Sequence, residues 1–536
     1  MTRQFISVVF ALLFLAPEGP RSAIADEPSA EKPPRAVLEI NADITLDANQ
    51  TYGAIVVKKS GVTIDGQGAW LIGNAEESAN AKQFKGAAIM ADGVSDVTLK
   101  NVNAKGWETG LLVRNAKNWT VTNCNFSDNF HDPDFGWGEN GRRGGIVLDH
   151  VQNSTLTGNQ ANRVWDACVL VDSDDNVLDG NDFSHTSNTC LKLWTSCRNS
   201  IRKNVLSHGI RISPGEVHAR DSTSVLIESG SNDNQFVSND CTHGGDGIFV
   251  RVLNGWCSTG NHFESNDCSF ANNNGIECWA PRNVFVRNKA NHCSYGFWLG
   301  GSDQTRLIEN EASYNGLATG HHNSPHLPDD GHAGIVFMFG PSSHTVARGN
   351  ICQGNNGAGI ALMGDLDSKG KKWKAYHWII ESNALAENRW GIFAQHADWI
   401  TLAGNRFRSN TVKDVFADGD VTRLTESTTE IPDSAAAPVA RLVGPTSVQQ
   451  GVSYIWDAST SADQQNHQLN FSWDLGDGQL REGPQLRHAF DKVGFHRIGL
   501  NVTNGLRTEL AWRDVYVVRP INELGTDDEQ IGRAHV

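Results

Sequence analysis

The chain has 536 residues, which is more than one ordinary domain, and a formal net charge of −16 at pH 7. This acidic balance on a soluble chain argues against nucleic acid and against an anionic membrane surface as partners. All ten cysteines lie before residue 430, so the composition changes along the chain and predicts at least two domains.

Residues 1–25 are expected to form a secretory signal. Arg3 precedes an apolar run from Phe5 to Leu15, and Ala23-Ile24-Ala25 offers a small-residue site with cleavage after Ala25. The apolar run is too short to span a membrane, and no later segment is long and apolar enough to do so. We therefore expect an exported protein without a transmembrane segment, located in the periplasm, on the cell surface or outside the cell. Residues 26–36 form a linker that contains prolines.

A repeat of fixed length organises residues 37–428. Asn266, Asn288 and Asn310 are 22 residues apart, and each interval contains a Gly followed by a short alternating apolar segment. The same column extends in both directions, through Asn101, Asn123, Asn159, Asn181, Asn204, Asn239, Asn350, Asn383 and Asn405. A period in the twenties predicts a solenoid, in which each repeat buries its apolar side chains only by stacking on its neighbours.

The apolar segments are short and rich in β-branched or aromatic residues, and Gly, Asn, Asp and Ser separate them. This pattern predicts strands and turns. The strands with the clearest alternation begin at Gly275-Ile276 and Gly296-Phe297. Equivalent pairs are Gly110-Leu111, Gly145-Ile146, Ala167-Cys168, Cys190-Leu191, Ser224-Val225, Gly247-Ile248, Gly334-Ile335, Gly359-Ile360 and Gly391-Ile392. A stacked Asn column can form hydrogen bonds from one coil to the next.

On these repeats, the chain resembles the right-handed parallel β-helix family, whose members include pectate and alginate lyases, polygalacturonases and mannuronan epimerases. The resemblance implies an all-β fold, a single-stranded parallel β-helix of about 12 coils. In such a fold Cys241 and Cys268 would point inward about 4.8 Å apart in consecutive coils. They are expected to be small core residues, although an oxidising compartment would allow a disulfide.

The C-terminal part has a different character. Residues 429–436 are expected to be a linker, and residues 437–519 contain the motif Trp473-Asp474-Leu475-Gly476-Asp477-Gly478. On this motif the segment is similar to a PKD domain, a small β-sandwich met in exported polysaccharide-active and surface proteins. The Trp is expected to fill the core of the sandwich and the Asp-Gly pair to form a turn, followed by a tail at 520–536.

The candidate site is the outward face of the Gly-led strands. If the residue after each Gly points inward, the next residue and the one two beyond it point outward. In the middle coils these two columns place aromatic and charged side chains on one exposed sheet: Lys192, Trp194, Glu228, Arg251, Glu277, Trp279 and Trp298. Exposed Trp beside mixed charges is typical of a sugar-binding face, so a polysaccharide is the expected partner.

Three longer coils support the same location. Their additional residues, 130–143, 210–222 and 316–332, fall between the column Asn and the Gly-led strand, and they are rich in His and Asp. We expect all three insertions to leave one corner and to wall a groove over the sheet. Asp166, His243 and Asp246 lie at the strand entrances of shorter coils.

Two reactions fit such a groove. A lyase or C5 epimerase acting on uronic acids needs a cation beside the carboxylate, a base and a proton donor. Lys192, Arg251 and His243 can fill these roles, with Glu228 and Glu277 as Ca²⁺ ligands. A glycoside hydrolase instead needs two carboxylates on either side of the bond, for which Asp166, Asp246 and Glu277 are candidates.

A non-catalytic role is the alternative from another class. Outward charges on a solenoid are often only a solvated face, so the chain can equally be a carbohydrate-binding scaffold or a cell-surface adhesin. The oligomeric state, the glycan and the choice between lyase and hydrolase stay open at this point.

Overall fold

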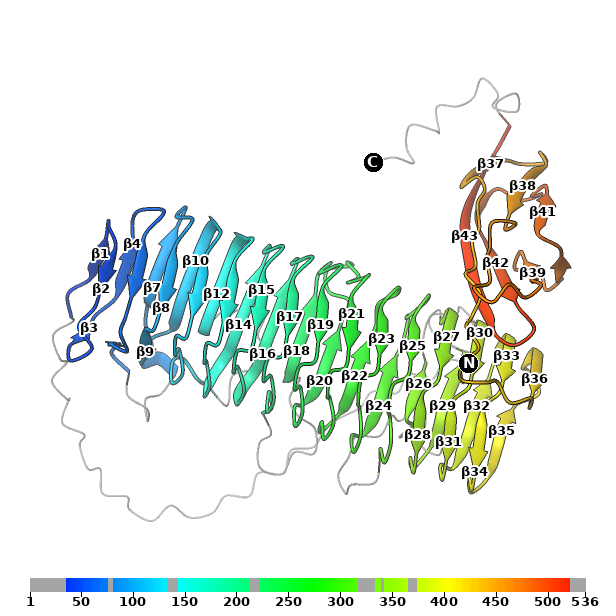
Figure 1. Cartoon of the computed structure of the whole chain (residues 1–536), viewed down its shortest axis with the longest axis horizontal. Coiled ribbons are helices and arrows are strands. Elements are labelled where there is room, and N and C mark those ends of the chain that lie inside the picture. The colour runs from blue at the N-terminus through cyan, green and yellow to red at the C-terminus, as the bar shows by residue number, and fades with distance from the viewer. Residues whose placement is uncertain are drawn as a thin grey trace, which may run out of the picture. The chain divides into compact units, whose positions relative to one another are not determined.

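The computed structural model describes residues 35–75, 81–132, 143–211, 222–316, 333–338, 342–364 and 374–520. The predicted signal at 1–25 and most of the three insertions lie outside these residues. Within them, strands follow one another in chain order along a solenoid, and a separate group of strands follows at the C-terminal end (Figure 1). The predicted all-β fold, a parallel β-helix followed by a small sandwich, is confirmed.

The first long sheet is parallel and has 15 strands, one from each coil. In order these are β1 (Leu38–Ile40), β4 (Ile55–Val57), β7 (Ala87–Asp92), β10 (Thr109–Lys117), β12 (Gly144–Gln152), β14 (Val164–Val171), β16 (Thr186–Trp194), β18 (Thr223–Glu228), β20 (Asp246–Val250), β22 (Asn274–Cys278), β24 (Tyr295–Leu299), β26 (Ile335–Phe337), β29 (Ala358–Met363), β32 (Trp390–Gln395) and β35 (Lys413–Ala417).

The second long sheet is also parallel with 15 strands, and its inward side faces the first across the core. Its strands are β2 (Ile44–Thr45), β5 (Thr63–Asp65), β8 (Thr98–Lys100), β11 (Thr120–Thr122), β13 (Thr155–Thr157), β15 (Val177–Asp179), β17 (Ser200–Arg202), β19 (Gln235–Val237), β21 (His262–Glu264), β23 (Val284–Val286), β25 (Arg306–Ile308), β27 (Ser343–Arg348), β30 (Ala375–Glu381), β33 (Ala397–Ala403) and β36 (Thr422–Ser427).

A third face closes each coil. It forms two short sheets, and single parallel bridges such as Asn125 with Gln160 continue it between them. Its strands are β3 (Thr51–Tyr52), β6 (Trp70–Ile72), β9 (Asn103–Lys105), β28 (Ile351–Gln353), β31 (Ala384–Ala386) and β34 (Arg406–Arg408), and one 3-10 turn, η1 (Ala81–Gln83), lies between β6 and β7. No helix in the described residues is long and apolar enough to span a membrane.

The predicted register of the first long sheet is confirmed. Ile276 pairs with Ile248 on one side and with Phe297 on the other, and all three are fully buried. Gly275 precedes Ile276 because a side chain has no room there: a β-carbon would lie 2.6 Å from Cβ of Ala290 in the same coil and 2.8 Å from the carbonyl oxygen of Gly296 in the next. Alternation therefore assigns inward and outward residues correctly along the sheet.

The Asn column is confirmed from Asn159 to Asn405. Asn266 shows the pattern: its backbone N–H and its side-chain Nδ2 both donate to Oδ1 of Asn288 at 3.0 Å. At the N-terminal end the predicted column is wrong by one residue, because Cys124 and not Asn123 donates to Oδ1 of Asn159. Asn101 and Asn123 instead occupy the left-handed backbone region one residue earlier, where Asn is tolerated.

Two further Asn ladders accompany the predicted one. One joins Asn176, Asn199, Asn234, Asn261 and Asn283, and the other joins Asn315, Asn355, Asn388 and Asn410. The members of the first of these lie five residues before members of the predicted ladder, and those of the second lie five residues after, so both repeat its intervals. The solenoid has 15 coils and not about 12, because the terminal coils carry no ladder Asn.

The C-terminal domain contains a five-stranded and a two-stranded sheet. Its strands are β37 (Ser447–Gln449), β38 (Tyr454–Asp457), β39 (Asn470–Asp474), β40 (Arg481–Glu482), β41 (Gln485–His488), β42 (Gly494–Thr503) and β43 (Thr508–Val518). Trp473 is fully buried in its core, and Asp474 accepts a hydrogen bond from the N–H of Gly476 at 2.6 Å, as the motif predicts.

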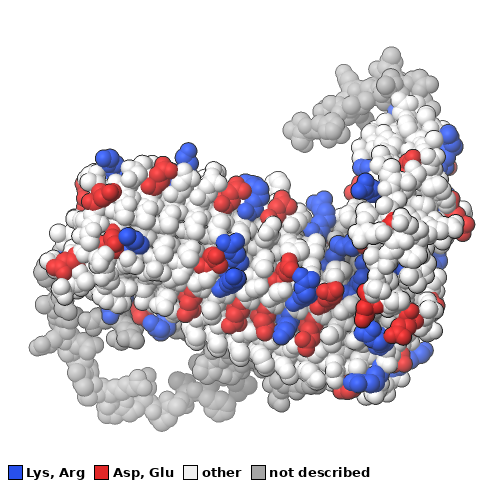
Figure 2. Space-filling view, in the orientation of Figure 1, with Lys and Arg blue, Asp and Glu red and all other residues white. Residues whose placement is uncertain are grey.

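Charged side chains pair between coils. Figure 2 shows basic and acidic groups interspersed over the face in view. Arg198 on one coil, for example, lies 2.9 Å from Asp175 of the preceding coil. The ten cysteines are all free thiols, and Cys241 and Cys268 are both fully buried, so the core role expected for this pair fits better than a disulfide.

Candidate functional site

The outward face of strands β16 to β22 carries the charged residues predicted from the sequence. The register aligns Lys192, Leu226, Phe249 and Glu277 in one row across four neighbouring strands. Neighbouring strands lie about 4.8 Å apart, so Lys192 and Glu277 are separated by about 14 Å. The face therefore holds two separate polar groups and not one cluster.

The first group is a buried ion cluster around Glu228. Its Oε1 accepts a hydrogen bond from Nε of Arg251, and its Oε2 lies 4.0 Å from Nζ of Lys192. The Glu228 side chain is fully buried and that of Lys192 is 5 % exposed. Lys192 also lies over the ring of Trp194, 5.7 Å from its centroid. The single negative charge of Glu228 is thus shared between two cations.

Asp166 lies at the start of β14, beside this cluster. Its Oδ1 accepts hydrogen bonds from Asn188 Nδ2 at 2.7 Å and from Thr189 Oγ1 at 2.6 Å. Among the described residues, no hydrogen-bond partner faces its Oδ2. Burial raises the pKa of Asp166, and the nearby Lys192 opposes this shift.

The second group is a pair of carboxylates joined by one amide. Asn274 Nδ2 donates to Asp246 Oδ1 at 3.1 Å and to Glu277 Oε2 at 2.6 Å. These two oxygens consequently lie within 5.7 Å of each other, which is the sum of the two hydrogen-bond lengths. The other oxygen of Glu277 accepts a hydrogen bond from Trp279 Nε1 at 2.5 Å. Asp246 is buried and Glu277 is half-buried at the surface of the sheet.

Asp166 does not join this pair. It aligns with Thr189, Thr223 and Asp246 in successive strands, so Asp166 and Asp246 are three strands apart. That separation is about 14 Å, beyond the span of the two carboxyl groups of a glycosidase. Of the three carboxylates predicted for hydrolysis, the structure brings together Asp246 and Glu277 only.

The prediction that Trp298 is exposed is wrong. Its side chain is buried, and its ring packs edge-on against Tyr295 at 4.5 Å. The outward positions of the following coils are apolar, and Val336 and Met338 form a cluster with Trp298. Val336 and Met338 occupy the two outward positions after Gly334-Ile335, so the sequence already indicated that this end of the face is apolar. Lys192 and Glu228 are likewise buried where exposure was expected.

Trp194 and Trp279 are half-buried, so part of each ring lies at the surface. Trp194 packs against Val147, Val169 and Val171 of the preceding coils. Trp279 lies over Gly300, where a β-carbon would come within 2.1 Å of its ring. Both rings contribute to packing as well as to the face.

His243 is not part of either group. It belongs to a column of stacked, mostly exposed rings, between His208 at 4.8 Å and Phe270 at 5.0 Å. The whole column is His185, His208, His243, Phe270, His292 and Tyr314, four residues after successive ladder Asn residues. Its neighbours cover both faces of the His243 ring, so the predicted role beside Lys192 finds no support. Because these rings follow the ladder Asn residues at a constant distance of four positions, the column could have been predicted from the sequence.

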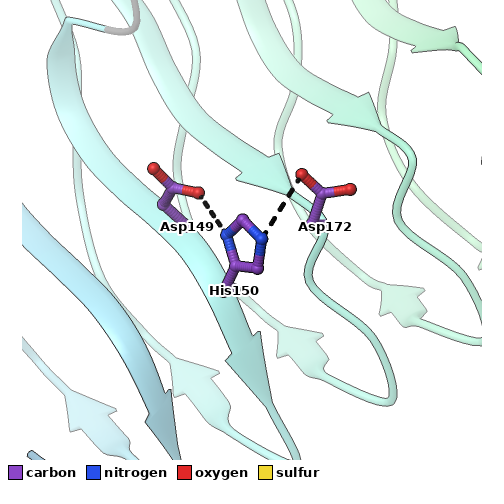
Figure 3. A group of neighbouring side chains, drawn as sticks. All are labelled: Asp149, His150 and Asp172. Carbon is purple, nitrogen blue, oxygen red and sulfur yellow. Dashed lines mark hydrogen bonds and ion pairs between the residues drawn. The ribbon is translucent and has the colours of Figure 1, made fainter. Parts of the chain in front are cut away.

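Glu228 and Glu277 do not fit the predicted Ca²⁺ site. They lie two strands apart, about 10 Å, and Arg251 already binds Glu228. Another group offers three ligand atoms within 4.8 Å of one another: Asp149, His150 and Asp172. Figure 3 shows His150 between the two carboxylates, with Nδ1 2.8 Å from Asp149 and Nε2 3.9 Å from Asp172. Arg114 lies 3.8 Å from Asp149 and competes with a cation there.

The described ends of the three insertions support the predicted corner. Residues 143, 222 and 333, at the C-terminal side of the insertions, stand one or two positions before strands β12, β18 and β26 of the first long sheet. Most of their His and Asp residues lie outside the described residues. Arg211, at one of these ends, lies over the buried ring of Trp165 at 5.2 Å.

Comparison with known families matches residues 60–240 and 207–428 to the right handed beta helix region, and residues 435–517 to the PKD domain. The chain therefore belongs to the right-handed β-helix family and carries a C-terminal PKD domain.

Several solved structures match the chain at low identity. The A-module of a mannuronan C-5 epimerase of Azotobacter vinelandii is 10% identical, with 73% of this chain and 91% of that chain covered and a TM-score of 0.34. A tailspike protein of E. coli bacteriophage HK620 is 10% identical, with 87% and 86% covered and a TM-score of 0.36. A carbohydrate-binding module of the β-sandwich superfamily is 21% identical; the match covers 16% of this chain and about a third of that one, 36%, with a TM-score of 0.15.

Proposed function

We propose that the protein is an exported polysaccharide-active enzyme that hydrolyses a glycosidic bond at the Asp246–Glu277 pair. The observation that carries this proposal is the single amide of Asn274 that donates to both carboxylates and keeps Oδ1 of Asp246 within 5.7 Å of Oε2 of Glu277. Retaining glycosidases hold their two carboxyl groups about 5–5.5 Å apart, whereas inverting enzymes need about 6.5–9.5 Å for a water molecule.

Exposure distinguishes the two carboxyl groups. Glu277 is half-buried at the surface of the sheet, and its two oxygens accept hydrogen bonds from Asn274 and Trp279. Asp246 is buried, and its Oδ1 accepts hydrogen bonds from the backbone N–H and the side chain of Asn274. We assign Glu277 as the nucleophile that attacks the anomeric carbon and Asp246 as the acid that donates its proton to the departing glycosidic oxygen. In the second step Asp246 takes a proton from water, which releases the sugar from Glu277.

The surroundings of the pair are compatible with a sugar. The half-buried ring of Trp279 lies beside Glu277, and Trp rings stack on pyranose rings. The lyase predicted from Lys192 and Arg251 has less support, because both cations face the buried carboxylate of Glu228 and Lys192 is itself buried.

Incubation with a polysaccharide panel tests the proposal. Purified protein is mixed with xylan, β-1,3-glucan, polygalacturonate and alginate, and new reducing ends and the absorbance of unsaturated products are followed together. Hydrolysis predicts reducing ends without unsaturated products. Unsaturated products would favour the lyase, and binding without either product would favour a carbohydrate-binding scaffold.

Variants connect the activity to the pair. Asp246→Asn and Glu277→Gln are each expected to lower the release of reducing ends by about 10²–10⁴-fold. Glu309→Gln is the matched control, since Glu309 is an exposed acid on another face of the solenoid. Full activity of either site variant would contradict the assignment.

A further inference from the structure

Trp256 stands out among the apolar side chains of the solenoid. It is 67% exposed, the highest value for a large apolar residue among the described parts of the chain. It lies in the connection from β20 to β21. Fifteen residue steps separate Ile248 from Phe263 there, whereas nine separate the aligned Ile276 and Phe285 of the next coil. The solenoid thus closes a coil without these additional residues.

The connection holds Trp256 on a tight turn. The N–H of Trp256 donates to the carbonyl of Leu253 at 3.1 Å, and the two residues form an antiparallel bridge. The central residues, Asn254 and Gly255, have φ values of 55° and 77°. Positive φ at both positions is required in a type I′ turn, for which Asn-Gly is a preferred sequence. The ring is therefore carried on an ordered support.

The position of Trp256 places it at the edge of the candidate site. A β-carbon on Gly230 would lie 3.7 Å from Cβ of Trp256, so Trp256 lies beside the turn that follows Glu228 at the end of β18. The connection begins at Arg251, whose guanidinium group binds Glu228. In the same sheet, Trp194 is the last residue of β16 and Trp279 directly follows β22. Three Trp residues consequently border one edge of the face over four strands, about 14 Å.

We propose that Trp256 is a stacking platform for a pyranose ring of a polysaccharide chain that runs along the solenoid axis, beyond the bond cleaved at Asp246 and Glu277. The proposal rests on the function proposed above and adds to it a subsite for long chains. An exposed indole on a rigid turn loses little conformational freedom on binding, and its two faces offer the apolar contact that sugar C–H groups need. Small substrates that occupy only the carboxylate pair do not reach it.

Affinity electrophoresis in gels containing xylan, β-1,3-glucan, polygalacturonate or alginate tests the platform. Trp256→Ala is expected to weaken retardation by the polysaccharide that retards the wild type by about five- to tenfold. Trp256→Tyr should recover most of the binding. Phe495→Ala is the matched control, because Phe495 is 63% exposed but lies in the C-terminal domain.

The second readout is hydrolysis. For the polysaccharide, Trp256→Ala should raise KM by a similar factor and leave kcat within about twofold, while hydrolysis of an aryl monoglycoside is unchanged. Equal retardation of Trp256→Ala and wild type, or an equal loss in Phe495→Ala, would overturn the platform. Retardation that depends on Trp256 without any release of reducing ends would support the platform and reject the hydrolase. A wild type that no polysaccharide retards would overturn the platform together with the proposed function.

Discussion

At the scale of single residues, the buried charges of the face are held by specific partners. Glu228 is fully buried, and Arg251 and Lys192 face its two oxygens. Removal of Glu228 would leave buried positive charge uncompensated, and removal of Arg251 would take away the donor bound to Glu228; breaking a buried pair by loss of one partner typically costs about 3–5 kcal/mol. Loss of activity in a Lys192 or Arg251 variant would therefore not identify a catalytic role.

Trp279 offers a cleaner test, because its two contacts can be separated. Trp279→Phe keeps a ring over Gly300 and removes the Nε1 donor to Glu277. Since that hydrogen bond fixes the orientation of the Glu277 carboxylate, we expect kcat to fall about tenfold. Thermal unfolding should change little. An unchanged kcat would show that Trp279 serves packing alone.

At the scale of the elements, each coil is stabilised by its neighbours. Ile276 and Phe297 are fully buried and pair across β22 and β24. The alternating pattern alone assigned both residues to the interior, because a one-residue shift would have moved every apolar side chain of the strand to the surface. The predicted bounds of 37–428 include the terminal coils, but the number of coils was set too low and the two additional Asn ladders were not predicted, since the prediction rested on the most regular Asn column.

Truncation of these core residues should destabilise more than one coil. Ile276→Ala and Phe297→Ala are each expected to cost about 2–5 kcal/mol, because each leaves a cavity in the stack. Hydrogen exchange should then increase in the neighbouring strands β20 and β26 as well, since solenoid repeats depend on their neighbours. Met90→Ala, at an outward and exposed position, is the control and should change stability little. Unchanged unfolding of both core variants would contradict the inward register.

At the scale of the whole described chain, ion pairs and hydrogen bonds join the last coils to the C-terminal domain. Arg306 binds Glu509 at 2.7 Å, and Arg423 binds Asp474. His377 in β30 is fully buried; its Nε2 lies 2.6 Å from Oδ1 of Asn501, and its ring stacks on Trp399 at 3.7 Å. These contacts couple the stability of the two domains.

Acid should weaken this coupling through His377. Burial lowers the pKa of His377 from 6.5 to about 3, against a smaller opposite effect of the hydrogen bond to Asn501. A lowered folded-state pKa means that the stabilisation is present above pH 6.5 and is lost as pH falls from there toward 3. His377→Gln should therefore show a shallower loss of unfolding free energy between pH 6.5 and 5, by up to about 1.4 kcal/mol per pH unit. His150→Gln, at an exposed site, is the control, and equal slopes for wild type and His377→Gln would contradict the prediction.

The fold could be predicted from the sequence much further than the site. A short repeated pattern specifies the fold, and the alternation of residues within each strand determines which side chains point inward and which point outward. The site depends on which outward side chains meet between coils, and that is decided by rotamers and by hydrogen bonds such as those of Asn274. Asn274 was not recognised as a site residue because a polar residue at a strand entrance is common. Trp256 was not predicted as a site residue because it lies in the connection after its strand, whereas the three insertions precede their strands.

The stereochemistry of the products tests the central claim most directly. The polysaccharide that releases reducing ends is digested with the wild type, and the anomeric configuration of the first products is followed by NMR before mutarotation. A separation within 5.7 Å between oxygens of Asp246 and Glu277 predicts net retention. Inversion, or products that form equally fast with Glu277→Gln, would contradict the assignment of this pair.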